Sequence, residues 1–163
     1  KNEKGPNIKY IYRAISASAS MPFVSKMVEI DGQHYLDGGC CTKVPYQWAL
    51  DQGYKKVVVI RTRPRDYRKK LSFIATHIPK MFYKNYPDFA EQLSNSNQHY
   101  NDDCERMNQL EKEGRIFVIA PSQPVTVGRL ETDMEKLGAL YEMGLNDVRR
   151  AIDGIKAYLN REE

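Results

Sequence analysis

The sequence has no long apolar run, few cysteines and little excess of either charge, and each absence excludes a class of protein. No apolar stretch approaches the roughly 20 residues that a membrane-spanning helix requires. The three cysteines, two of them adjacent as Cys40 and Cys41, are too few and too poorly spaced for a disulfide framework, so we expect a reducing compartment and a cytoplasmic protein. A net charge of +4 is too small to indicate nucleic-acid binding.

The composition is that of a globular protein. Of the 163 residues, 41% are hydrophobic and 28% are charged, which is enough apolar surface to bury a core within one ordinary domain. The first residues include neither an initiator Met nor the basic and apolar pattern of a signal peptide. We therefore expect the chain to start at a processing boundary.

The first third of the chain predicts a helix followed by a hairpin. Residues Ile8 to Ser20 are rich in small side chains, which permit close packing, and Pro22 limits the helix. Residues 27–30 and 34–36 flank Asp31-Gly32, which is typical of a tight two-residue turn. Asp37 follows the second strand directly, so the sequence places a carboxylate at the end of a hairpin.

The middle of the chain predicts an α/β arrangement. A short helix over residues 45–53 precedes the run VVVI at 57–60, whose lack of alternation is typical of a parallel strand buried on both faces. A second such strand is expected at 116–120. The helical stretches 71–86 and 87–112 lie between the two strands, so a right-handed parallel crossover is the natural connection.

The last 40 residues predict two helices. Thr132 or Asp133 would cap a helix that ends at Gly144, and a second helix would follow. The second helix aligns apolar residues at helical spacing: Leu145, Val148, Ile152, Ile155 and Leu159. We expect a helical hairpin packed on the sheet, and a domain boundary that separates residues 1–121 from a helical extension over residues 122–163.

The most informative segment is residues 17–45, in which Asp37 is followed by Gly38 and Gly39. Glycines permit a close approach of the backbone beside the carboxylate, so Asp37 is a candidate catalytic base. An aspartate at the end of a hairpin is also a common turn residue that accepts backbone hydrogen bonds. The residues alone leave both interpretations open.

The same segment resembles a known family. Ala17 to Phe23, the hairpin, the Asp37-Gly38-Gly39 block, Pro45, the short helix and the VVVI strand resemble, in order and spacing, the second catalytic block of patatin-like phospholipases. The resemblance implies a partial three-layer patatin-like α/β fold with a mostly parallel sheet. It also implies a lipid acyl hydrolase in which Asp37 pairs directly with a serine, without a histidine, metal or organic cofactor.

A complete enzyme of this kind needs two further motifs. One is a Gly-x-Ser-x-Gly turn that exposes the nucleophile, and the other is a glycine-rich loop that stabilises the oxyanion. Neither occurs in this sequence, and Ser16, Ser18 and Ser20 lack flanking glycines, so we expect them to pack in a helix. Both motifs precede the aspartate block in the family. We therefore expect that the N-terminal half of the protein is missing, and that this chain alone is inactive.

Two other features allow different functions. The basic cluster, residues 61–70 (RTRPRDYRKK), precedes an apolar segment containing Phe73, Ile74, Phe82 and Tyr83. Together they would suit peripheral contact with an anionic membrane, in a lipase or in a non-catalytic membrane-surface or protein-interaction module. A solvated basic loop before a core helix is the simpler interpretation, and nucleic-acid binding is disfavoured because no recognition motif accompanies the cluster.

A metal site is not expected. Its candidate ligands would be His34, Cys40, Cys41, His99 and Cys104, but adjacent cysteines are poorly spaced for chelation and no C-x-x-C pair occurs. The resemblance to patatin-like phospholipases likewise implies a lipid or ester substrate and no cofactor.

Overall fold

The computed structural model describes residues 8–128 and 130–161, which form two compact units. Unit 1 combines residues 1–43 and 70–100, and unit 2 combines residues 44–69 and 101–163. The structure is a mixed α/β fold with one small antiparallel sheet and one small parallel sheet, as the sequence predicted. The domain boundary expected after residue 121 stays a prediction.

Unit 1 begins with helix α1 (Ile8–Ser18), which contacts the first strand of a hairpin. Strands β1 (Val28–Ile30) and β2 (Gln33–Tyr35) pair antiparallel, with Ile30 opposite Gln33. The connecting residues Asp31 and Gly32 both have positive φ angles, of 50° and 76°, which is the geometry expected for a tight turn here. The predicted helix and hairpin are thus confirmed.

Two more helices complete unit 1. Helix α3 (Phe73–Phe82) precedes α4 (Pro87–Lys112), whose first half belongs to this unit. Pro87 suits the first helical position because its missing N–H would have no partner in the helix, and Gly114, with a φ of 72°, follows the other end. The buried side chains of unit 1 include Ala17, Ile30, Cys40, Pro79 and Ala90.

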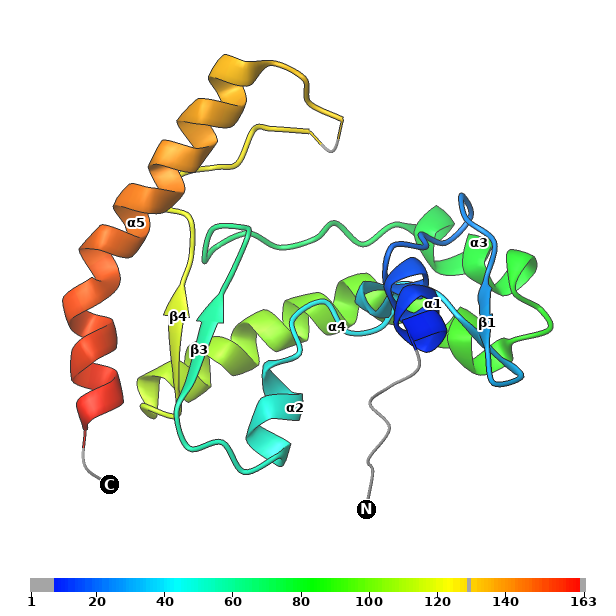
Figure 1. Cartoon of the computed structure of the whole chain (residues 1–163), viewed down its shortest axis with the longest axis horizontal. Helices are drawn as coiled ribbons and strands as arrows, with labels where there is room; N and C mark the ends of the chain where they lie inside the picture. The colour runs from blue at the N-terminus through cyan, green and yellow to red at the C-terminus, as the bar shows by residue number, and fades with distance from the viewer. Residues whose placement is uncertain (1–7, 129, 162–163) are drawn as a thin grey trace. The chain divides into compact units, whose positions relative to one another are not determined.

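Unit 2 is built on the parallel sheet. Helix α2 (Tyr46–Asp51) precedes β3 (Val57–Ile60), and β3 pairs in parallel with β4 (Ile116–Ile119) along its whole length. The two strands lie side by side, and helix α5 (Met134–Asn160) runs along β4 (Figure 1). The core contains Met107 and Cys104 from the second half of α4, together with Ile116 and Val118.

Tyr158 fastens α5 to the beginning of the sheet. Its hydroxyl accepts a hydrogen bond from the Val57 amide at 2.9 Å and donates one to the Arg115 carbonyl at 2.8 Å. Its ring lies beside that of Phe117, with centroids 5.8 Å apart, and Phe117 also contacts the helix at Gly154. A single buried side chain thus links the starts of both strands to the last helix.

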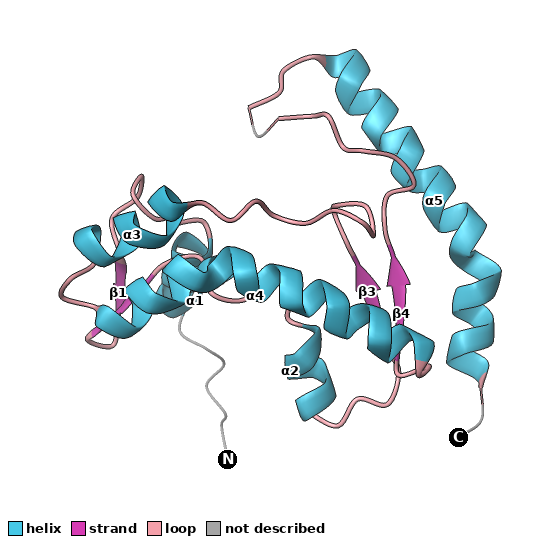
Figure 2. Ribbon diagram, turned by 180° about the vertical axis from the view of Figure 1, so that it is seen from behind, coloured by secondary structure: helices cyan, strands magenta, loops and turns pink. Residues whose placement is uncertain are grey.

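The predicted helical hairpin is wrong. Helix α5 continues without interruption through Gly144 (Figure 2), and Asp133 caps its start by accepting hydrogen bonds from the amides of Glu135 and Lys136. A glycine inside a helix costs only about 1 kcal/mol relative to alanine. Beyond Gly144, the side chains of Asp147 and Tyr158 on α5 are buried against the rest of unit 2. That packing outweighs the weak stop signal.

Burial also differs from the prediction in two places. Only Val59 of β3 is buried, whereas Ile60 is 70% exposed, so one face of this strand is covered and not both. The apolar stripe of α5 is only partly covered, because Leu145 and Ile155 are half-buried whereas Val148, Ile152 and Leu159 are exposed. The apolar runs thus identified the strand and the helix correctly, but they did not show which faces of β3 and α5 the rest of the described chain covers.

Candidate active site

Asp37 lies at the start of a short 3-10 helix, η1 (Gly38–Cys40), just beyond β2. Its amide donates to the Ser20 carbonyl at 2.9 Å, which fixes the backbone against the end of α1. Its Oδ1 atom accepts a hydrogen bond from the Gly39 amide, also at 2.9 Å, and the side chain is half-buried. The backbone thus holds the carboxylate in one orientation through two contacts.

The two glycines after Asp37 differ in their surroundings. A Cβ atom on Gly39 would lie 3.3 Å from Asp37 Oδ1, which is closer than most real Cβ contacts, whereas a Cβ atom on Gly38 would meet nothing within 4 Å. The close approach expected from the sequence is therefore made at Gly39. This residue permits the hydrogen bond that orients the carboxylate.

The two cysteines of the same loop are poor nucleophiles. Burial, followed by the nearby Asp37 carboxylate and Cys41, raises the pKa of the Cys40 thiol to about 11. Burial also raises the pKa of Cys41. Because the thiolate is the reactive form, both side chains are unreactive thiols at neutral pH. All three cysteines of the chain are free.

Phe23 has an unusual backbone conformation. Its φ angle is 66°, a left-handed value that is rare for a bulky residue and costs on the order of 1–3 kcal/mol. Its amide donates to the hydroxyl of Tyr83 at 2.9 Å, and its ring meets those of Phe82 and Tyr83 at centroid distances of 5.4 and 5.5 Å. These contacts hold the ring against α3. The spacing of apolar residues in the sequence does not indicate the pairing of Phe23 with Tyr83, because the two residues lie 60 positions apart.

Three apolar residues of the segment 17–45 are close to Asp37 in the sequence: Met21, Phe23 and Leu36. Leu36 is half-buried, whereas Met21 and Phe23 are exposed in this chain. The three serines expected to pack in a helix behave differently. Ser16 and Ser18 lie in α1 but are exposed, whereas Ser20 lies just beyond α1, is buried and donates to the Ser16 carbonyl at 2.8 Å.

The basic cluster begins directly after β3, as predicted, but its guanidinium groups are engaged within unit 2. Arg61 is only 4% exposed and donates to the Pro64 carbonyl and to the Cys104 sulfur. Arg65 forms an ion pair with Glu111, and Arg68 forms one with Glu105. Much of the charge that the sequence offered to a lipid headgroup therefore stabilises loop 61–69 against α4.

The described residues contain neither a metal-binding cluster nor a membrane-spanning helix. Within residues 8–128 and 130–161, no three His, Cys, Asp or Glu side chains are grouped so that they could hold a metal ion. In the same part of the chain, no helix combines the length and the apolar character needed to span a bilayer. Asp37 and its loop are therefore the candidate site with the most defined geometry.

Comparison with known protein families gives two matches. Residues 3–50 match the profile described as Patatin-like phospholipase. The N-terminal third of the chain is patatin-like. This segment contains α1, the hairpin and Asp37, which are therefore the part of the chain that is similar to this family. Residues 86–160 match a second profile, Domain of unknown function (DUF6363), which covers α4, β4 and α5.

A similar protein is known from Escherichia coli (strain K12). The Uncharacterized protein YjjU is 30% identical over 135 residues, which cover 80% of this chain. The chain spans 37% of the length of that relative. The relative is thus much longer than this chain.

Proposed function

We propose that this chain supplies Asp37 as the aspartate of a Ser-Asp dyad in a patatin-like lipid acyl hydrolase, with the serine on a segment outside these 163 residues. The observation that carries the proposal is that Asp37 lies in the segment that matches Patatin-like phospholipase and has an oriented carboxylate there. Oδ1 is held by the Gly39 amide at 2.9 Å, which leaves Oδ2 as the oxygen that would face a serine hydroxyl. A turn aspartate also makes this capping bond, so the position of Asp37 in the matching segment is what favours a catalytic role.

The proposed chemistry is ester hydrolysis through an acyl-serine intermediate. The carboxylate would accept the serine proton as the hydroxyl attacks the ester carbonyl, and that proton would pass to the departing alcohol. Water would then release the acid from the serine in a second step. The Gly39 amide contributes by fixing the orientation of the base before the reaction begins, so no reorganisation is needed during it.

The test is hydrolysis of a short p-nitrophenyl ester by the protein expressed from the complete reading frame and by this chain alone. Asp37→Asn should reduce kcat by at least about 10³-fold, which is the scale of removing one member of a coupled catalytic unit. Asp31→Asn is the matched control, because Asp31 lies on the exposed hairpin turn and asparagine tolerates its positive φ. Retained hydrolysis in Asp37→Asn, or turnover by this chain alone, would disprove the proposal.

The alternative is a non-catalytic lipid-surface or protein-interaction module based on residues 61–70. Its support is weaker, because Arg61, Arg65 and Arg68 make internal contacts.

Peripheral membrane contact by the hydrolase has better support from α3, where Phe73 and Ile74 are exposed. A cytoplasmic hydrolase would then contact the membrane through these apolar side chains of α3. Replacing Phe73 by serine should abolish the sedimentation of the protein with anionic vesicles.

A further inference from the structure

Unit 1 contains a groove with a volume of about 440 Å³ between the loop at Phe23 and the helices α3 and α4. Its walls are mainly apolar and come from Ile78, Pro79 and Phe82 on α3, Leu93 on α4, and the ring of Phe23. This volume lies in the range of ligand-binding cavities, which are lined mostly by hydrophobic side chains with a few polar groups. No charged side chain lines the groove, so its chemistry suits a neutral, apolar ligand.

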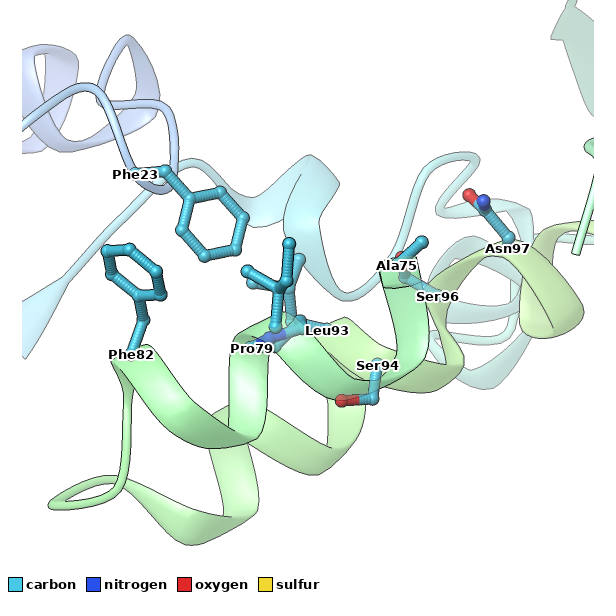
Figure 3. A pocket seen from close by; sticks show the side chains of 9 residues that line it. Phe23, Ala75, Pro79, Phe82, Leu93, Ser94, Ser96 and Asn97 are labelled. Carbon is cyan, nitrogen blue, oxygen red and sulfur yellow. The ribbon is translucent and has the colours of Figure 1, made fainter. Parts of the chain in front are cut away.

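The groove has one apolar end and one polar end. Phe23 and Phe82 lie together at one end, whereas Ser96 and Asn97 lie at the other, and Leu93 lies between them (Figure 3). Such a lining suits an elongated ligand that is apolar over most of its length. An unbranched hydrocarbon chain with a polar group at its end has this character.

The candidate active-site loop is hydrogen-bonded to one lining residue of the groove and to the segment that carries another. Lys43 donates from its Nζ atom to the carbonyl of Ser96, which lines the polar end, at 3.0 Å. The Asp37 amide donates to the carbonyl of Ser20, which does not line the groove but lies three residues before Phe23 in the chain. The loop from Asp37 to Lys43 is therefore fastened to the segments that form the groove, and all of these residues belong to unit 1.

The conformation of Phe23 provides a further indication. A bulky side chain at a φ angle of 66° persists only where its surroundings hold it. Here the Tyr83 hydroxyl accepts the Phe23 amide proton and the ring of Phe82 packs edge-on against that of Phe23. Strain of this kind is concentrated at ligand-binding and active sites. In this fold it places an aromatic ring where it closes one end of the groove.

We infer that this groove binds the acyl chain of the ester substrate and thereby sets the preferred chain length. The inference rests on the proposed function, because it assigns a substrate subsite to the Asp37 site. Burial of each methylene group contributes about fourfold in affinity. An octanoyl ester, with four more methylenes than a butyryl ester, should therefore gain up to about 200-fold in kcat/KM if all four enter the groove.

The test uses the protein from the complete reading frame with butyryl and octanoyl p-nitrophenyl esters. Ala75→Phe fills the groove from α3, and Met81→Phe is the matched control, because Met81 is 70% exposed on the same helix and does not line the groove. Ala75→Phe should lower the octanoyl-to-butyryl ratio of kcat/KM at least tenfold with little change for the butyryl ester. Met81→Phe should leave the ratio unchanged. An unchanged ratio in Ala75→Phe would overturn the inference.

A binding measurement separates this inference from the proposed catalytic role. The Asp37→Asn protein should bind a fluorescent fatty acid, and adding Ala75→Phe should weaken its Kd about tenfold. If Ala75→Phe fails to fold by circular dichroism, Phe82→Ser tests the same wall, and it should also weaken binding. Equal binding by the groove variants would exclude the groove as the acyl site even if Asp37 proves essential for hydrolysis. Conversely, weakened binding alongside full hydrolysis by Asp37→Asn would retain the groove and exclude the dyad.

Discussion

Replacing Gly39 by alanine should damage the candidate site without removing any chemical group. The added Cβ atom would lie 3.3 Å from Asp37 Oδ1, so the carboxylate must move by a few tenths of an ångström or lose its hydrogen bond from the Gly39 amide. Hydrogen bonds to charged groups contribute about 1.5–3 kcal/mol. If the bond orients the base, its loss corresponds to a decrease of about 10- to 150-fold in kcat.

The assay is steady-state hydrolysis of p-nitrophenyl butyrate by the protein from the complete reading frame. KM should change little, because Gly39 orients the base and not the substrate. Gly38→Ala is the matched control, since its Cβ atom would meet nothing within 4 Å of this chain. A wild-type kcat in Gly39→Ala, or equal losses in both variants, would refute the assigned role of the Gly39 hydrogen bond.

Three further predictions concern the stability of unit 2, measured by urea denaturation. Tyr158→Phe should lower the free energy of unfolding by at least about 1 kcal/mol, because two backbone groups lose their partner, whereas Tyr141→Phe, at a position that is 69% exposed, should have no effect. Gly144→Ala should stabilise α5 by about 0.5–1 kcal/mol, but Gly154→Ala should destabilise it because its Cβ atom would lie 3.2 Å from the ring of Phe117. Burial opposes ionisation of the Asp147 carboxyl, but hydrogen bonds from Ser122 and the ion pair with Arg150 outweigh it and lower the pKa. The ionised carboxylate therefore stabilises the folded state at pH values above the ordinary carboxyl range, and this contribution is lost as the pH falls below about 4. Asp147→Asn should remove this part of the acid dependence, and an unchanged pH profile would contradict it.

Local signals in the sequence predicted several helices, strands and turns well. Asp31-Gly32 specifies the hairpin turn through its positive φ angles, and the β-branched run at residues 57–60 identifies β3. Pro87 and Asp133 mark the starts of α4 and α5. These features depend on backbone preferences of a few neighbouring residues, which the sequence displays directly.

Features that depend on distant contacts could not be predicted in the same way. Gly144 resembles a helix stop, but the buried contacts of Tyr158 and Asp147 favour a continuous helix. The groove depends on Phe23 meeting α3, and the pairing of Phe23 with Tyr83 has no local signature. The arginines of the basic cluster looked available for headgroups because their acidic partners on α4 lie about 40 residues away in the sequence.

The most direct test of the central claim is covalent acylation, measured by intact-protein mass spectrometry after mixing the protein from the complete reading frame with a p-nitrophenyl ester. If Asp37 activates the serine, the unmodified protein and Asp31→Asn should both gain the mass of one acyl group, and Asp37→Asn should not. Acylation of Asp37→Asn at the rate of the unmodified protein would show that another group activates the nucleophile, and that Asp37 only forms the turn.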